Sequence, residues 1–267
     1  MNKIVNGNIT IYLQDLRLKR DINYPYVIKP GTTLNDILDI NKDGYTTLVY
    51  PTINYFCIGV GGTKFVNETD YTISNHSAKD VQPFDMIPFL IRELNNDIDL
   101  NTRKDYSFRK EIVINGTPYV AYYLKRIKDI VSRDEFFKIA IDENKRNSLS
   151  ILNTNDTGIL YPKPIDKTTL MAHKEKATLI VKTNKFLFSL DDNELKELKN
   201  VMDVLGKDSK LTEIALCTSI TPSNITGEPS KVQCGYFTTC DIDINMRIAE
   251  SYPVRLYLEV GSNEPYL

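Results

Sequence analysis

The clearest pattern of apolar and polar positions lies between residues 176 and 220 and predicts a strand, a helix and a second strand. Apolar runs at 177–181 and 186–188 predict the first strand. The helix is indicated by apolar residues at helical spacing, namely Leu195, Leu198, Val201, Met202 and Leu205. An apolar run at 211–217 predicts the returning strand, so the helix is expected to pack its apolar face on a sheet.

Both ends of this helix carry sequence signals. Asp191 is followed three residues later by Glu194, the spacing of a capping box, in which side-chain oxygens accept hydrogen bonds from backbone N–H groups of the first turn. Gly206 follows the last apolar position and readily takes the positive φ with which many helices end. We therefore predict one well-capped helix at 191–205 with a structural role and no residue left for a substrate.

Most other regular segments are typical of strands. Asn115-Gly116 is the strongest hairpin signal and predicts a type I′ turn between strands at 109–114 and 117–127. Alternating apolar and polar residues at 231–241 and 254–260 predict two further strands. The expected fold class is α+β and predominantly β, with antiparallel sheets or a sandwich, one capped helix on a sheet, and long loop excursions.

The N-terminal third is less regular. Residues 8–18 alternate weakly and are expected to form a strand, and residues 33–38 a short helix. Residues 59–83 are polar, contain three glycines and predict a long loop.

These patterns divide the chain into three parts. A β-rich N-terminal part is expected at 1–131, a polar insertion or linker at 132–176, and a strand–helix–strand part at 177–267. One continuous domain is the alternative.

Composition limits the classes of function. The net charge is −2, so no global field attracts nucleic acid or an anionic membrane. No signal peptide is evident at the start, and no apolar run approaches the ~18 residues of a membrane span. The four cysteines form no CxxC pair and are expected to be reduced thiols, and the two histidines have no partner at zinc-ligand spacing.

One segment partly matches a calcium-binding loop. Asp39, Asn41 and Asp43 place oxygen side chains at alternate positions before Gly44. The twelfth position, which requires a bidentate Glu, is Tyr50. An Asx-rich turn that ends a helix explains the same residues, and we expect no metal and no cofactor.

Other chemical motifs are incomplete. The glycines at 59–62 superficially match a phosphate loop, but no Gly-Lys-Ser/Thr ending and no clear helix follow them. Asp97 and Asp99 are a candidate carboxylate pair for a hydrolase, although polar turns explain them. Basic and aromatic residues interleave at 103–110, where nearby acids favour a salt-bridged face or subunit contact over nucleic-acid binding.

Four stretches together resemble virion structural proteins of large tailed bacteriophages. They are the glycine-rich bend at 55–63, the segment 87–94, the hairpin at 115–125 and the Thr-Glu-Ile-Ala-Leu strand at 211–216. The arrangement is also similar to N-terminal modules of tail-collar and fibre-attachment proteins. The resemblance implies a β-rich assembly module, made in the host cytoplasm and present in many copies in the virion, with no catalytic residue to carry over.

The favoured hypothesis is therefore a non-enzymatic component of the tail, neck, collar or baseplate. Its partners would be copies of itself and other virion proteins, in contacts made by segments 21–31, 59–83 and 132–176. The candidate interface residues are aromatic, namely Tyr24, Tyr26, Phe65, Tyr71, Tyr106, Tyr122, Phe136 and Phe137. The alternatives are a receptor- or carbohydrate-binding adhesion module and a hydrolase.

Overall fold

A computed structural model of the chain describes residues 7–42, 46–47, 50–66, 71–141, 147–152, 178–222 and 227–266. Its helices are α1 Ile11–Asp21, α2 Leu34–Leu38, α3 Asp192–Val204 and α4 Ile244–Ala249, with 3₁₀ turns η1 Leu94–Asn96 and η2 Thr102–Lys104. The first strands are β1 Gly7–Ile9, β2 Tyr26–Val27, β3 Thr46–Thr47, β4 Thr52–Gly59, β5 Thr63–Phe65, β6 Tyr71–Ile73, β7 Met86–Ile87 and β8 Leu90–Glu93. The later strands are β9 Tyr106–Ile114, β10 Thr117–Arg126, β11 Ile130–Ile141, β12 Asn147–Leu152, β13 Thr178–Leu190, β14 Lys210–Ile220, β15 Ser230–Asp243 and β16 Val254–Tyr266.

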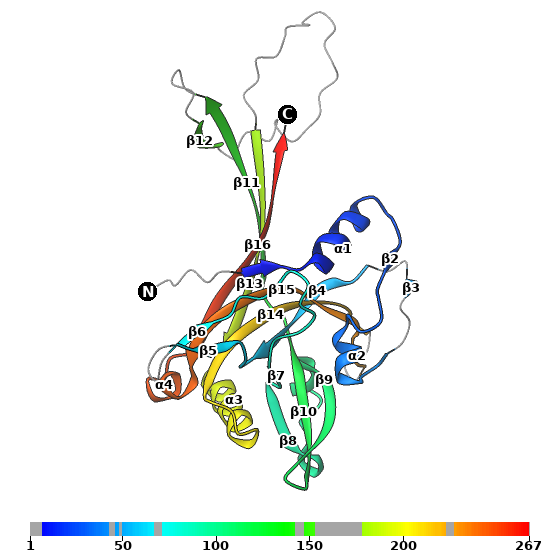
Figure 1. The fold of residues 1–267 in the computed structure, drawn as a ribbon, viewed down its shortest axis with the longest axis vertical. Coiled ribbons are helices and arrows are strands. Elements are labelled where there is room, and N and C mark those ends of the chain that lie inside the picture. The colour runs from blue at the N-terminus through cyan, green and yellow to red at the C-terminus, as the bar shows by residue number, and fades with distance from the viewer. Residues whose placement is uncertain are drawn as a thin grey trace, which may run out of the picture. The chain divides into compact units, whose positions relative to one another are not determined.

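The predicted fold class is confirmed. Strands outnumber helices (Figure 1), and the registered strand pairs are antiparallel. The main sheet has the order β1-β15-β14-β4-β10-β8, with β7 paired to β4 and β9 to β10. Nine consecutive residues of β14 are buried, as in a strand covered on both faces.

Helices cover this sheet at several points. α1 and α2 pack against β15, and α3 packs against β8 and α4. Leu34 and Leu38 of α2 join residues of β4, β14 and β15 in one apolar core cluster. The segment between Gly59 and β7 includes the two-stranded β5–β6 ladder.

The capped helix and the hairpin are both confirmed. The Asp191 carboxylate accepts hydrogen bonds from the backbone N–H groups of Asn193 and Glu194, and Glu194 accepts one from the Asp191 N–H, which completes the capping box. Asn115 and Gly116 have φ of 51° and 82°, the left-handed pair that a type I′ turn requires.

The strand predicted at 8–18 is wrong, since only Gly7–Ile9 is extended and α1 follows it. Thr10 caps this helix, because its Oγ1 accepts a hydrogen bond from the Leu13 N–H at 3.3 Å. The apolar residues Ile11 and Leu13 suggested the two-residue spacing of a strand. The structure shows the three-residue spacing of a helix instead, with Leu13 and Leu16 both buried.

The chain forms two compact units that are discontinuous in sequence. The first comprises Met1–Lys128 with Leu187–Leu256, and the second Asp129–Phe186 with Tyr257–Leu267. The predicted parts were continuous segments, so their boundaries do not coincide with those of the units. Strands β13 and β16 each contribute residues to both units, a non-local arrangement that the sequence pattern does not reveal.

The second unit contains a four-stranded sheet of order β12-β11-β13-β16. Residues 132–141 and 147–152, part of the predicted insertion or linker, belong to β11 and β12. Phe136 is paired with Leu152 on one side and with Ile180 on the other. The remainder of that predicted segment, 142–146 and 153–176, lies outside the described residues.

Candidate functional site

Three of the eight aromatic residues predicted to lie at an interface are core residues instead. Tyr26, Tyr106 and Tyr122 are buried, and each hydroxyl donates a hydrogen bond inside the chain. The acceptors lie 2.6 to 2.7 Å away and are side-chain oxygens of Gln233, Glu194 and Asp97, respectively. A buried tyrosine needs such a partner, which explains why sequence alone did not separate these residues from surface aromatics.

The other five aromatic candidates remain candidates. Tyr24 is 60% exposed. Tyr71 of β6 lies opposite Phe65 of β5, and its hydroxyl donates to a carboxylate oxygen of Asp241 at 2.5 Å. Phe136 and Phe137 lie on β11 in the second unit.

The described part of the candidate calcium loop forms the end of α2. Asp39 has a left-handed φ of 59° and pairs with Lys42. The Asn41 amide donates to the backbone oxygen of Glu228 at 2.9 Å. Asp43 lies outside the described residues. The alternative of a helix-ending turn therefore accounts for the contacts of Asp39 and Asn41.

The candidate hydrolase carboxylates make structural contacts. Asp97 accepts hydrogen bonds from the Tyr122 hydroxyl at 2.6 Å and from Arg109 Nε at 2.9 Å. Burial raises the pKa of Asp97, but these hydrogen bonds outweigh burial and lower it below its usual value. Asp99 accepts the backbone N–H groups of Asn101 and Thr102 in a turn.

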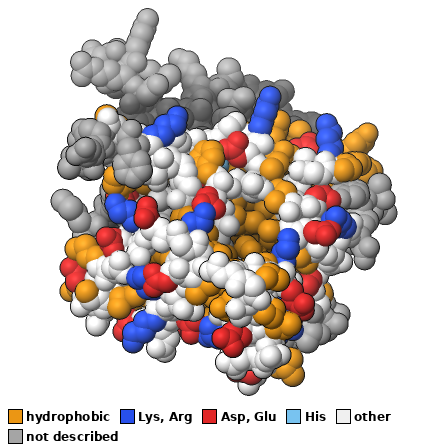
Figure 2. Space-filling model, turned by 60° about the horizontal axis from the view of Figure 1, so that its bottom comes forward, with side chains coloured by type: hydrophobic (Ala, Val, Ile, Leu, Met, Phe, Trp, Pro, Cys, Tyr) orange, Lys and Arg blue, Asp and Glu red, His pale blue; other side chains and the backbone are white. Residues whose placement is uncertain are grey.

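The basic and aromatic segment 103–110 is a salt-bridged face, as the charge pattern indicated. Arg109 pairs with Asp97, and Arg103 pairs with Glu228 at 3.4 Å. On the face drawn in Figure 2, positive and negative side chains are interspersed around a central group of hydrophobic ones.

Helix α1 has a second apolar face that is exposed. Ile11 and Leu18 are seven residues apart and therefore share one side of the helix, opposite the buried residues Leu13 and Leu16. Asp15 lies between them on that side and pairs with Lys19, and Ile22 follows the helix as its C-cap residue. Leu18 is 63% exposed and Ile22 is 64% exposed.

The exposed apolar residues continue beyond the helix. Tyr24 and Val27 follow it and are also exposed, while Tyr26 between them is buried. We call the exposed set Ile11, Leu18, Ile22, Tyr24 and Val27 the α1 apolar surface. Single exposed apolar residues need no explanation, whereas here five lie within seventeen residues of the chain.

A buried histidine links the loop before β7 to the main sheet. His76 Nδ1 lies 2.8 Å from Asp80 Oδ2, and His76 Nε2 lies 3.2 Å from Glu213 Oε2 on β14. The imidazole is stacked between the rings of Phe84 and Phe237, with centroids 4.2 and 3.9 Å away. The side chains of His76 and Glu213 are fully buried, and that of Asp80 is partly exposed.

The three glycines of the superficial phosphate loop allow this cluster to form. A Cβ at Gly59 would lie 2.9 Å from Glu213 Oε2 and 2.7 Å from the Pro83 Cβ. One at Gly61 would lie 2.7 Å from the backbone nitrogen of Asp85. The element that follows is strand β5 and not a helix, so the glycines serve close packing at the end of β4.

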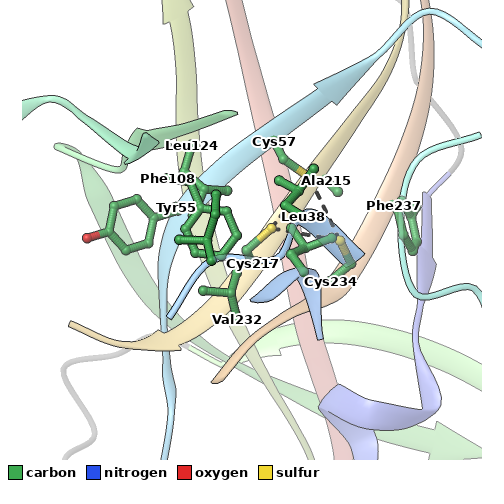
Figure 3. Close-up of a cluster of buried hydrophobic side chains, with 12 residues drawn as sticks. Leu38, Tyr55, Cys57, Phe108, Leu124, Ala215, Cys217, Val232, Cys234 and Phe237 are labelled. Atoms are coloured by element: carbon green, nitrogen blue, oxygen red, sulfur yellow. Dashed lines mark hydrogen bonds between the residues drawn. The ribbon is translucent and has the colours of Figure 1, made fainter. Parts of the chain in front are cut away.

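Three of the four cysteines meet in the core (Figure 3). Cys57 on β4, Cys217 on β14 and Cys234 on β15 are completely buried. Their Sγ atoms are 3.5 Å apart for Cys57–Cys217, 3.8 Å for Cys57–Cys234 and 3.8 Å for Cys217–Cys234. No short cysteine motif signals this cluster, because strand pairing brings together residues up to 177 positions apart.

The three thiols differ in acidity. Burial raises the pKa of Cys234, and hydrogen bonding with Cys217 and Cys234 raises that of Cys57. Burial also raises the pKa of Cys217, but hydrogen bonding with both neighbours outweighs this effect and lowers it to about 5.

The buried tyrosines predict a loss of stability at alkaline pH. Burial raises the pKa of Tyr26, Tyr106 and Tyr122 above the ordinary value of 10.0, so the folded chain keeps phenolic protons that the unfolded chain loses. Their contribution is complete below about pH 10 and falls above it by about 1.4 kcal/mol per pH unit for each residue. Urea unfolding at about pH 8 and pH 11 should show a smaller pH-dependent loss in Tyr106→Phe than in the control Tyr252→Phe, whose ring is exposed. Equal losses in the two variants would contradict the prediction.

Comparison with known proteins gives one match. Residues 2–267 match the model of a family described as "Family of unknown function (DUF7208)". No curated protein and no solved structure matches the chain. Within the described part of the chain, no helix has the length and apolar character needed to cross a membrane.

Proposed function

The chain belongs to the DUF7208 family, and we propose for it a non-enzymatic, structural role as a component of a tailed phage virion. In this role it builds subunit interfaces in the tail, neck, collar or baseplate, with copies of itself and with other virion proteins. The α1 apolar surface is the observation that carries the interface part of the proposal.

That surface suits a contact between copies of this chain. A twofold contact places the same patch on both partners, and a helix with one apolar stripe is able to pair with itself in this way. Helix α1 carries both signs of charge, and Asp15, on the same side as Ile11 and Leu18, is paired with Lys19 at 2.8 Å. Mixed charge avoids the repulsion that a single-sign helix would meet from its own copy.

The polar residues of the first unit support a structural role as well. The carboxylates that sequence singled out are engaged in turns or ion pairs, and His76 and Glu213 hydrogen bond to each other with fully buried side chains. The virion assignment itself rests on the resemblance of four sequence stretches to phage structural proteins. These stretches contribute to β4, the β9–β10 hairpin and β14, which form the frame of the main sheet.

The interface part is tested by the double substitution Leu18→Lys with Ile22→Lys. We expect the wild-type chain to self-associate. The dissociation constant of the double variant should be at least about tenfold higher, because two exposed apolar side chains become charged. Analytical ultracentrifugation over a concentration series measures this shift. Val113→Lys is the matched control, because Val113 is 71% exposed on the β9–β10 hairpin, away from α1 in the sequence.

The outcomes separate the two parts of the proposal. A wild-type chain that stays monomeric at every concentration, or equal association of both variants, would contradict a self-contact through α1. The virion part is tested independently by mass spectrometry of purified phage particles, in which the protein should be present in many copies. Its absence from particles, together with specific retention of the free chain on a glycan array, would favour a separate adhesion module.

A further inference from the structure

The triangle of sulfur atoms in the first unit has the dimensions of a metal site. Its edges of 3.5, 3.8 and 3.8 Å make Cys57, Cys217 and Cys234 nearly equidistant from one another. A metal ion bonded to thiolates at about 2.3 Å reaches all three sulfurs from a point slightly outside their plane. Only sulfur atoms contribute to this group among the described residues.

The sheet holds these residues in position. Cys217 and Cys234 are direct partners in the β14–β15 ladder, and Cys57 is the β4 partner of Ala215, two residues before Cys217. Ala215 and the three cysteines belong to one buried apolar cluster, and Figure 3 shows the cysteine side chains gathered beside Ala215. Because three hydrogen-bonded strands fix the backbone, a bound ion requires little rearrangement of the chain.

The donor set and surroundings define the class of ion. Sulfur donors without oxygen or nitrogen select soft cations such as Zn²⁺ and Cu⁺ over Mg²⁺ and Ca²⁺. The site is completely buried among apolar side chains, including those of Leu38, Leu124 and Val232. Such an enclosed site keeps no open position for water and therefore suits a structural ion.

We propose that Cys57, Cys217 and Cys234 bind one thiophilic cation of the Zn²⁺ or Cu⁺ type, which fastens β4, β14 and β15 together at the centre of the sheet. Zn²⁺ is favoured by charge, because three thiolates around a dication leave less net charge in an apolar core than three around a monocation. Cu⁺ is favoured because all the donors are sulfur atoms and because there are three of them, whereas Zn²⁺ in structural sites usually takes four ligands. The thiols are enclosed once the sheet has formed, so the ion enters during folding and its binding stabilises the fold.

The experiment refolds the reduced full-length chain without oxygen in the presence of Zn²⁺, Cu⁺ or a metal chelator. After desalting, we expect elemental analysis to find one ion per chain with at least one of the two metals. Thermal unfolding of that sample should occur at a higher temperature than unfolding of the chelator-treated sample. Competition between the two metals during refolding then identifies the preferred ion.

Substitution of a ligand provides the control. Cys217→Ala should retain at least about tenfold less metal, since it removes one of three sulfur ligands. Cys240→Ala should retain as much as the wild type, because Cys240 is the buried cysteine outside the triangle and its thiol donates to the Leu211 carbonyl. Equal retention by both variants would overturn the proposal.

A measurement on the wild-type chain keeps the proposal testable if Cys217→Ala does not fold. X-ray absorption at the metal edge should show sulfur as the only near neighbour of the ion. Oxygen or nitrogen ligands would overturn the assignment, and so would a wild-type chain that refolds fully and retains neither metal. A disulfide between any two of the three cysteines, detected by mass spectrometry of the purified chain, would also overturn it.

Discussion

Replacing Glu213 with alanine is expected to lower the free energy of unfolding by about 2–6 kcal/mol, because it leaves two buried hydrogen-bonding groups without their acceptor at about 1–3 kcal/mol each. The Glu213 carboxylate is fully buried and accepts hydrogen bonds from the backbone N–H of Phe84 at 2.7 Å and from His76. Without it, the N–H and the imidazole are left in a closed apolar space with no replacement partner. Urea unfolding followed by circular dichroism measures the change.

Two matched variants distinguish the loss of the Glu213 hydrogen bonds from the general effect of replacing a glutamate. Glu213→Gln keeps the shape and one acceptor oxygen and should lose less stability than Glu213→Ala. Glu93→Ala removes an exposed carboxylate at the end of β8 and should change the free energy of unfolding by no more than about 0.5 kcal/mol. If Glu213→Ala is as stable as Glu93→Ala, the cluster does not hold the loop on the sheet.

The cluster also predicts where the loss appears first. His76, Asp80 and Phe84 belong to one loop, and their contacts with Glu213 and Phe237 attach that loop to β14 and β15. Amide hydrogen exchange in Glu213→Ala should therefore increase at residues 74–85 before it increases in β14. Uniform acceleration across the first unit would instead indicate global destabilisation.

Leu198→Ala is expected to lower the free energy of unfolding by about 2–5 kcal/mol, because it opens a cavity beneath α3. Leu198 is completely buried, together with Leu195, Val201 and Met202 on the same helix face. Urea unfolding at neutral pH measures the difference from the wild type.

Lys196→Ala is the matched control on the opposite face of α3. Lys196 is exposed, and alanine has a higher helix propensity, so its effect should stay within about 0.5 kcal/mol. Similar effects at positions 196 and 198 would mean that α3 does not pack on the sheet through the face assigned to it.

Whether a candidate site was interpreted correctly from the sequence depended on how far apart in the chain its interacting residues lie. The incomplete motif at Asp39 was interpreted correctly from the sequence as a helix end, because neighbouring residues determine it. The burial of Tyr26, Tyr106 and Tyr122 was missed, because their hydrogen-bond partners lie 207, 88 and 25 residues away in the chain. Strand alternation predicts which residues share a face of a sheet and does not predict which strand lies next.

The amino-acid sequence by itself determined the elements whose signals are local. The capping box of α3 spans four residues and the Asn115-Gly116 turn spans two, so their backbone preferences appear directly in the residue order. Only the tertiary structure decided that α1 is a helix with an exposed apolar face, that β13 and β16 enter two units, and that three cysteines meet in the core. The physical reason is that strand order depends on the total burial gained by the whole sheet, to which residues far apart in the chain contribute together.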